Sequence, residues 1–301
     1  MQNLLSRLTT SKYIDLPFGV AGWLGWLLLL AIFAFALWKN WEALQVRRLP
    51  RVAVFLVLAL ATPFAAWGLG IILGDGATLP YMPVEPNPPA LMFFAALPWV
   101  LAAGGLGTIS AALLGVLSGI CLALSETHSL YTPLQVGFLA LLFATAVRQR
   151  YRTRFYQALR HPVIAALVVV LPFLAMVVFS SIFEVTGEPA VRLDYGITRT
   201  WPFVLARCLE LLLAAVVGEA MLLLRSRYWR RPAILLPSPS ESSLQARFAM
   251  TTLPLLLLLA FGMIIGDWLV AGNAARSMLR NQLSSTATVA ADSLPYFMEA
   301  G

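Results

Sequence analysis

Residues 96–126 read ALPWVLAAGGLGTISAALLGVLSGICLALSE and carry a single charge, the terminal Glu126. The apolar stretch begins near residue 90. As one continuous helix to residue 124 it would be about 50 Å long, well beyond the ~30 Å apolar layer of a membrane. Gly104, Gly105 and Gly107 interrupt it. A tight hairpin between two spans and a kink within one long helix are both open, and length favours the hairpin.

The rest of the chain has the same apolar character. Of 301 residues, 60% are hydrophobic and 12% are charged, where a soluble domain carries about 25% charged residues. We therefore predict an all-α, polytopic transmembrane helical bundle of about eight spans, with lipid as its solvent. The predicted spans are 18–38, 52–74, 90–103, 106–124, 133–147, 163–183, 201–224 and 248–270.

Basic residues between the apolar blocks set the expected orientation. Loops rich in Lys and Arg stay in the cytoplasm, and the intervening loops 75–89, 125–132 and 184–200 carry only Arg192 and Arg199. The two kinds of loop alternate only if the apolar stretch from residue 90 to 124 is two spans, and both termini then face outward. The predicted cytoplasmic loops contain Lys39, Arg47, Arg48 and Arg51; Arg148, Arg150, Arg152, Arg154 and Arg160; and Arg225, Arg227, Arg230, Arg231 and Arg247.

The composition also predicts the domain organisation. Residues 1–229 form a seven-span bundle, and a cytoplasmic linker rich in Pro and Ser follows at 230–243. Residues 244–271 form the eighth transmembrane helix. Residues 272–301 are rich in Ala, Ser and Thr with apolar residues at helical spacing, so this helix is expected to continue outside the membrane as a stalk. Because the chain stops just after an apolar cluster, we expect a longer protein, and an immediate stop codon after Gly301 would refute this.

No catalytic signature is present. The sequence lacks a Walker loop, a His-Glu-x-x-His pair and a Gly-x-Ser-x-Gly elbow, so we predict no catalytic residues, no metal site and no cofactor. His128 is interpreted as a solvated loop histidine beside Glu126, and His161 follows a basic loop. Cys121 and Cys208 lie within apolar blocks, which argues against a disulfide.

Three ionisable residues within the seventh predicted span are the candidate site: Arg207, Glu210 and Glu219. Each is costly inside a bilayer and needs a partner or a cavity. Arg207 and Glu210 are three residues apart and share one helical face. They make either a buried site for a ligand or a conformational switch, or a self-neutralised pair with Arg207 reaching toward the interface. Glu219 is expected nearer the inner face, paired with Arg225 or a neighbouring basic loop.

Small residues at four-residue intervals form a ridge at Ala111, Gly115 and Gly119, which lets another helix approach closely. Packing within the bundle is the favoured interpretation, and a dimer contact is the alternative.

The tract with Arg148, Arg150, Arg152 and Arg154 interleaves cations with aromatic residues. We predict that these arginines contact anionic lipid and do not bind nucleic acid.

Two stretches carry a family resemblance. Residues 95–152, with the quoted apolar run, a further span and RQRYR, resemble the multi-span membrane-associated sensor regions at the front of bacterial signalling proteins, and also substrate-binding subunits of vitamin transporters. Residues 243–301, with SLQARF, an apolar span and NAARSMLRNQLSSTATVAADSLPYF, are similar to the span and stalk helix that begin a Cache-type extracytoplasmic sensor. The resemblance implies a location in the bacterial inner membrane and a histidine kinase or phosphatase output of a two-component system, which these residues do not include.

We therefore expect a sensory input module that relays an unknown small ligand or the state of the bilayer through the last span. The resemblance also implies a possible homodimer through the last span and stalk helix. The alternative is a transporter, or its substrate-binding subunit, that holds a small solute near Arg207 and Glu210.

Overall fold

The computed structural model describes the greater part of the chain. Its contacts divide the protein into two units, Met1–Ser238 and Pro239–Gly301. The division falls inside the predicted linker, whose role stays a prediction. The described residues are 13–17, 19–40, 49–73, 90–184, 189–224, 229, 235–238, 243–245, 248, groups of one to three positions from 252 to 280, and 281–288.

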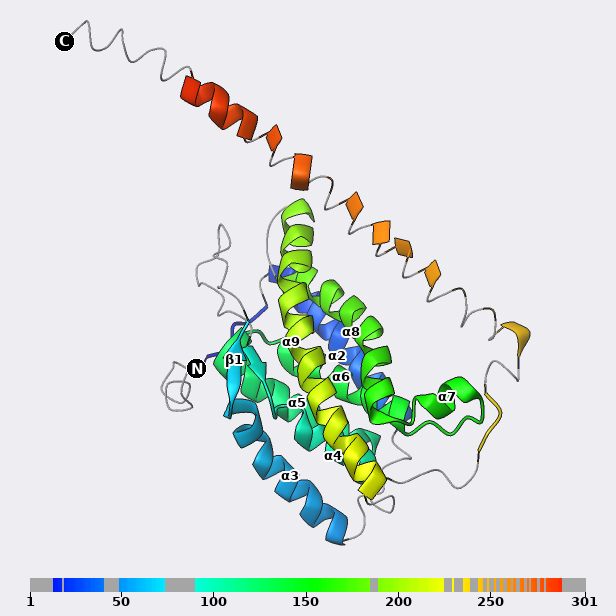
Figure 1. The fold of residues 1–301 in the computed structure, drawn as a ribbon. Helices are drawn as coiled ribbons and strands as arrows, with labels where there is room; N and C mark the ends of the chain where they lie inside the picture. The colour runs from blue at the N-terminus through cyan, green and yellow to red at the C-terminus, as the bar shows by residue number, and fades with distance from the viewer. Residues whose placement is uncertain are drawn as a thin grey trace, which may run out of the picture. The chain divides into compact units, whose positions relative to one another are not determined.

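The first unit is a bundle of helices with one small two-stranded sheet (Figure 1), which confirms the predicted all-α class. Helix α5 packs along α6, and α8 packs along α9, while α3 lies against α4 and α5, and α2 lies against α8 and α6. The helices are α2 (Gly19–Lys39), α3 (Leu49–Trp67), α4 (Leu97–Gly105), α5 (Thr108–Leu122), the π-helical turn η2 (Ala123–Thr127), α6 (Thr132–Val147), α7 (Arg154–Ala158), α8 (Pro162–Glu184) and α9 (Pro189–Leu224).

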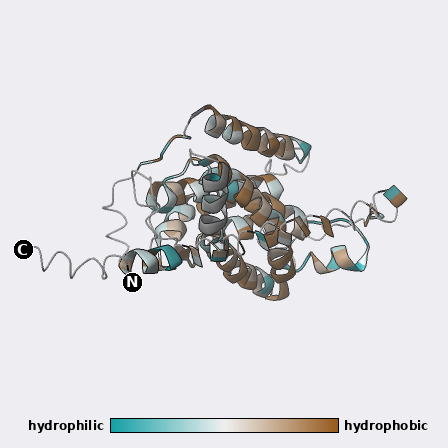
Figure 2. Cartoon of the chain, turned by 90° about the horizontal axis from the view of Figure 1, so that it is seen from above, coloured by the Kyte–Doolittle hydropathy of each residue, from teal (hydrophilic) through white to brown (hydrophobic). Residues whose placement is uncertain are grey.

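Among the described residues, three helices are long and apolar enough to cross a membrane: Gly19–Lys39, Thr108–Thr127 and Pro162–Glu184. Large apolar side chains on two of them, such as Leu24, Phe35 and Leu171, are exposed on the protein surface, as expected where lipid rather than protein covers a helix. Hydrophobic residues dominate the helices of the bundle (Figure 2). By length and composition, these helices could cross a membrane, which supports membrane association.

The predicted third span, residues 90–103, is wrong as a helix. Residues Ala90–Met92 form strand β2, a turn follows, and helix α4 has nine residues, about 14 Å of rise. The preceding predicted span, 52–74, also ends early, because α3 stops at Trp67 and Gly70–Ile72 forms strand β1. The strands pair antiparallel, with Gly70 opposite Met92. Pro98 in the first turn of α4 favours a helix start there.

The glycine break is a hairpin between two helices. Gly107 has φ 138°, a conformation that residues with a Cβ rarely adopt, and its N–H and that of Leu106 both donate to the Ala102 carbonyl. The Ser118 hydroxyl near the end of α5 donates to the Ala95 carbonyl just before α4, at 3.1 Å. Helices α4 and α5 are therefore antiparallel neighbours.

The predicted loop 184–200 is largely helical. Helix α9 begins at Pro189 and runs for 36 residues, which gives a length of about 54 Å. Proline is well suited to a helix start because its missing N–H would have no partner there. The sequence interpretation placed this helix start at residue 201, twelve residues too late.

The small-residue ridge lies against α6. A Cβ on Gly115 would lie 2.5 Å from the Cβ of Ala140, and a Cβ on Gly119 would lie 2.6 Å from the Cα of Pro133. Ala111 is fully buried in the same core. These contacts lie within the bundle rather than on its surface.

The second unit is helical at every described position from residue 244 to residue 288. Apolar side chains along it, such as Leu255, Met263 and Met278, are exposed. The eighth transmembrane helix and the stalk remain predictions, and residues 289–301 of the stalk lie outside the described residues.

Candidate functional site: a buried charge clamp beside a polar pocket

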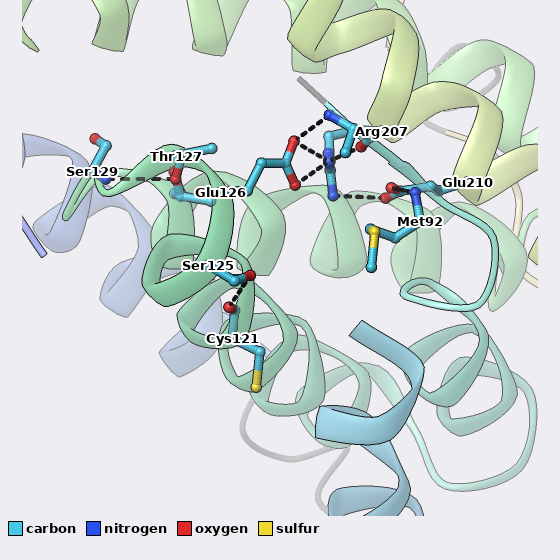
Figure 3. A network of polar contacts seen from close by, with 10 residues as sticks. Met92, Cys121, Ser125, Glu126, Thr127, Ser129, Arg207 and Glu210 are labelled. Atoms are coloured by element: carbon cyan, nitrogen blue, oxygen red, sulfur yellow. Dashed lines mark hydrogen bonds and ion pairs between the residues drawn. The ribbon is translucent and has the colours of Figure 1, made fainter. Parts of the chain in front are cut away.

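Arg207 on α9 joins two carboxylates inside the bundle (Figure 3). Its Nη2 lies 2.9 Å from Oε1 and 3.0 Å from Oε2 of Glu126, and its Nη1 lies 2.9 Å from Oε2 of Glu210. The three side chains are 1–3% exposed. We call Glu126, Arg207 and Glu210 the charge clamp.

The charge clamp holds the backbone of strand β2. The Ala90 N–H donates to Glu126 Oε1 at 2.8 Å, and the Met92 N–H donates to Glu210 Oε1 at 2.6 Å. Arg207 Nη2 also donates to the Ala90 carbonyl at 2.8 Å. Alternate residues of a strand present their N–H groups to the same edge, so both carboxylates meet one edge of β2 while β1 pairs with the strand.

This arrangement explains how extended backbone persists among apolar helices. A buried N–H or carbonyl without a partner costs roughly 1–3 kcal/mol, and membrane proteins keep irregular backbone only where protein groups satisfy it. The charge clamp supplies these partners. In the charge clamp one guanidinium is paired with two carboxylates. The Arg207 guanidinium also lies over the Phe203 ring, with Cζ 5.5 Å from the ring centre.

The predicted pairing of Arg207 and Glu210 on one face of α9 is present, but Arg207 does not reach toward an interface, because it is 1% exposed. Glu126 was assigned to a solvated loop and is instead the second carboxylate of the charge clamp. The π-helical turn η2 carries it, and such turns recur at functional sites.

Glu219 contacts a different partner. Its Oε1 lies 2.8 Å from Nδ1 of His161, and the two side chains are 24% and 51% exposed. Arg225, one expected partner, lies outside the described residues, and His161 directly follows the neighbouring basic loop that was the other expectation. The pair therefore lies at a partly exposed position, away from the hydrogen bonds of the charge clamp.

A polar pocket lies next to the charge clamp. Its polar lining comes from four elements and consists of Thr127, Thr132, Gln135, Ser181, Glu184 and Thr200, and Val177 and Phe203 complete the wall. The Gln135 amide donates to Ser180 Oγ at 2.7 Å and approaches Glu184 Oε1 at 3.5 Å. The Thr127 and Thr132 hydroxyls are 2.6 Å apart. Sequence reasoning missed this pocket, since single Ser and Thr residues in apolar helices give no spacing signal.

Tyr131 and His128 tie the same end of the bundle to the N-terminal helix. The Tyr131 hydroxyl donates to the Gly22 carbonyl at 2.5 Å. Burial, with the negative charge of Glu184 as the second cause, raises the pKa of Tyr131 to about 12. The His128 ring stacks on Tyr13 at 4.0 Å and is buried, so the interpretation as a solvated loop histidine is wrong.

The far end of the hairpin contacts the segment that follows α9. The Trp229 ring packs against α4, where a Cβ on Gly104 would lie 2.3 Å from its Cε3 atom, and against Gly218 of α9. Arg148 Nη1 donates to the carbonyls of Ala103 and Gly104 at 3.1 and 3.4 Å, where a cation is favourable at a helix C-terminus.

The basic tract itself is mostly exposed. Arg150, Arg152 and Arg154 are exposed, whereas Arg148 is half-buried against α4. Leu236 pairs with this tract, since its N–H donates to the Arg150 carbonyl at 2.8 Å and the Arg152 N–H donates to the Leu236 carbonyl at 3.1 Å. Lipid contact by these arginines stays a prediction.

Within the part of the chain that the structure describes, no cluster of three or more His, Cys, Asp or Glu side chains is placed to hold a metal ion. Comparison with protein-family models, curated proteins and solved structures finds no match to this chain. The function must therefore be argued from the charge clamp, the pocket and the hairpin.

Proposed function

We propose that this chain is the sensory input module of a bacterial signal-transduction protein, embedded in the inner membrane as a multi-pass bundle of about eight spans. A ligand or the state of the bilayer acts on the bundle, and the last span relays the change to an output domain. The predicted output is a histidine kinase or phosphatase, by the resemblance of residues 95–152 and 243–301 to such proteins.

One observation carries the proposal. The segment from Ala90 to Gly105, which we call the arm, has the charge clamp at its first end and Trp229 at its last. Trp229 lies five residues after the end of α9 at Leu224 and directly before the predicted linker. The arm thus contacts both the buried charge clamp and the residue that precedes the predicted linker.

The mechanism is a shift in population between two positions of the arm. Arg207 and Glu210 lie on α9, and Glu126 lies on η2, so a movement of α9 against η2 changes the grip on β2. The displaced arm changes the packing of Trp229, which directly precedes the predicted linker, and Leu236 within that linker is hydrogen-bonded to the basic tract. Interfaces of packed side chains favour discrete positions over continuous deformation.

Disulfide cross-linking tests this relay. In a protein with Cys121 and Cys208 replaced by Ala, single cysteines are introduced at exposed positions of the second unit, such as Leu255, Leu259 and Met263. We expect cross-links between two copies in membranes, and an altered pattern of cross-linked positions in Glu210→Gln, which weakens the hold on Met92.

The matched control is Glu219→Gln, which removes the same charge from the same helix without touching β2. An unchanged cross-linking pattern in Glu210→Gln, with the protein folded and cross-linked, would refute the relay. A pattern that changes equally in both variants would show a general loss of packing and refute it as well.

A transporter, or its substrate-binding subunit, is the second candidate, and the polar pocket beside a broken membrane segment favours it. Uptake of a radiolabelled solute by cells that express only residues 1–231 would support this function. Uptake that is lost in Glu210→Gln and kept in Glu219→Gln would place the solute at the charge clamp.

A further inference from the structure

The polar pocket is built from buried oxygen atoms. Thr132, Gln135, Ser181 and Thr200 are buried, although they lie on helices whose other residues are mainly apolar. Burying a hydroxyl costs free energy unless a partner satisfies it. Here the hydroxyls pair with one another, Thr127 with Thr132 at 2.6 Å and Thr200 with Ser181 at 3.4 Å, which gathers several oxygen lone pairs around one cavity.

The donor atoms in the pocket suit a hard cation. Hydroxyl oxygens accept through lone pairs that rotate with the side chain, and the hydroxyls of Thr127, Thr132, Ser181 and Thr200 all line the cavity. Glu184 adds a carboxylate. Hard cations such as Na⁺ and Ca²⁺ prefer oxygen ligands, whereas thiolate and imidazole select transition metals.

The charge around the pocket favours a single positive charge. Two helices end at the pocket, η2 at Thr127 and α8 at Glu184, whereas one helix, α6, begins there. Helix C-termini attract cations, so the helix dipoles favour a positive charge in the pocket. Glu184 is the one charged residue in the lining, and the nearby carboxylates of Glu126 and Glu210 are paired with Arg207. One carboxylate in the lining matches a monovalent ion better than a divalent one.

Cavity size restricts the occupant further. The cavity volume is about 10 Å³, which is room for about one water molecule. An organic solute does not fit without rearrangement. We propose that this pocket binds one small monovalent cation, with Na⁺ as the probe.

The cation site adjoins the charge clamp in two places. Phe203 lines the cavity and lies under the Arg207 guanidinium. Thr127 lines the cavity and directly follows Glu126 in η2. Cation binding here goes beyond the proposed sensory function and does not depend on it.

Thermal unfolding of the full chain in lipid nanodiscs tests the site. Melting temperatures are compared in NaCl, KCl and choline chloride at equal ionic strength, and the binding of radioactive Na⁺ is measured directly. We expect one ion per chain and a rise in melting temperature of about 3 °C for each tenfold increase of Na⁺ above its Kd. Choline, which is too large for the cavity, produces no such rise.

Variants locate the ion. Glu184→Gln is expected to lower Na⁺ affinity at least tenfold, and Ser181→Ala, which removes one oxygen and keeps the charges, several-fold. Glu219→Gln is the control with unchanged affinity. Equal melting curves in all three salts would mean that the pocket holds only water and would overturn the proposal. Na⁺ binding that both pocket variants retain at full affinity would overturn it too, whatever the cross-linking experiment shows about signalling.

Discussion

The two ends of the arm are held by opposite kinds of interaction. At β2 the partners are three charged side chains, Glu126, Arg207 and Glu210, all buried. At the C-terminal end of α4 the main partner is the Trp229 ring, fitted against Gly104 and Gly218, with Arg148 on the last carbonyls. Charge fixes one end, and shape fixes the other.

The difference follows from the backbone at each end. The helical end of the arm satisfies most of its own N–H and carbonyl groups, so packing and one cation suffice there. The extended end has none of these internal bonds and depends on β1 at one edge and on side chains from α9 and η2 at the other. A change at the charge clamp therefore releases backbone groups into an apolar surrounding, whereas a change at Trp229 alters only packing.

The largest expected effect is at the charge clamp. Arg207→Leu leaves Glu126 and Glu210 as buried carboxylates without their cation, and breaking a buried ion pair from one side costs about 3–5 kcal/mol. We expect a fall in melting temperature of about 10 °C in nanodiscs, because the variant also loses the hydrogen bond from Arg207 to the Ala90 carbonyl of β2.

A second measurement separates charge from packing in this comparison. The triple variant Glu126→Gln, Arg207→Leu, Glu210→Gln removes all three charges together and is expected to recover part of the lost stability. A triple variant less stable than Arg207→Leu alone would contradict the role of uncompensated charge.

At the Trp229 end a smaller effect is expected from overpacking. Gly104→Ala places a Cβ 2.3 Å from the ring carbon Cε3, and such insertions cost about 1–3 kcal/mol. Trp229→Leu in the same chain is expected to relieve the clash, so the coupling energy between the two substitutions is favourable. Gly218→Ala, whose Cβ would lie 3.1 Å from the ring, is the graded control. Equal losses of stability in Gly104→Ala and Gly218→Ala would refute the tight packing of Trp229 against Gly104.

The sequence was sufficient for the helical class and for the shared face of Arg207 and Glu210, because both depend on local spacing. At the glycines it left a hairpin and a kink open, and only the length of the apolar stretch favoured the hairpin. It was insufficient for β2, since a short apolar strand and a short apolar helix segment look alike in periodicity. The hydrogen bonds to the β2 backbone come from Glu126, Arg207 and Glu210, which are distant in the sequence.

The role of Glu126 in the charge clamp also could not be predicted from the sequence. Glu126 lies 81 residues before Arg207, at the end of an apolar block, where a solvated loop was the simpler interpretation. The inward direction of its side chain depends on the π-helical turn η2, which no sequence pattern indicates. The one sequence feature that could have indicated a buried role for Glu126 is its position as an acidic residue at the end of an apolar block.

A neutral hydrogen bond near the charge clamp is expected to matter less than either end of the arm. Tyr131→Phe removes the hydroxyl that donates to Gly22, at a cost of about 1 kcal/mol. Since the pKa of Tyr131 is raised from 10.0 to about 12, the neutral phenol stabilises the fold fully below pH 10, and this contribution is lost as the pH rises through about 12. Melting curves at pH 8, 10 and 11 should show a smaller alkaline decline in Tyr131→Phe than in wild type. An equal decline would contradict the assignment.

The smallest effect is expected at the exposed ion pair of α9. His161 is 51% exposed and Glu219 is 24% exposed, so water and salt screen their interaction, and such pairs contribute about 0–1 kcal/mol. Glu219→Gln and Arg207→Leu each alter one charged residue of the same helix, yet the first should shift the melting temperature by at most about 3 °C. Raising the ionic strength should shrink that shift and leave the larger one in place, because the charge clamp excludes solvent. Similar losses of stability in Glu219→Gln and Arg207→Leu, both reduced by added salt, would contradict this prediction. Burial would then not distinguish the charge clamp from the exposed ion pair on the same helix.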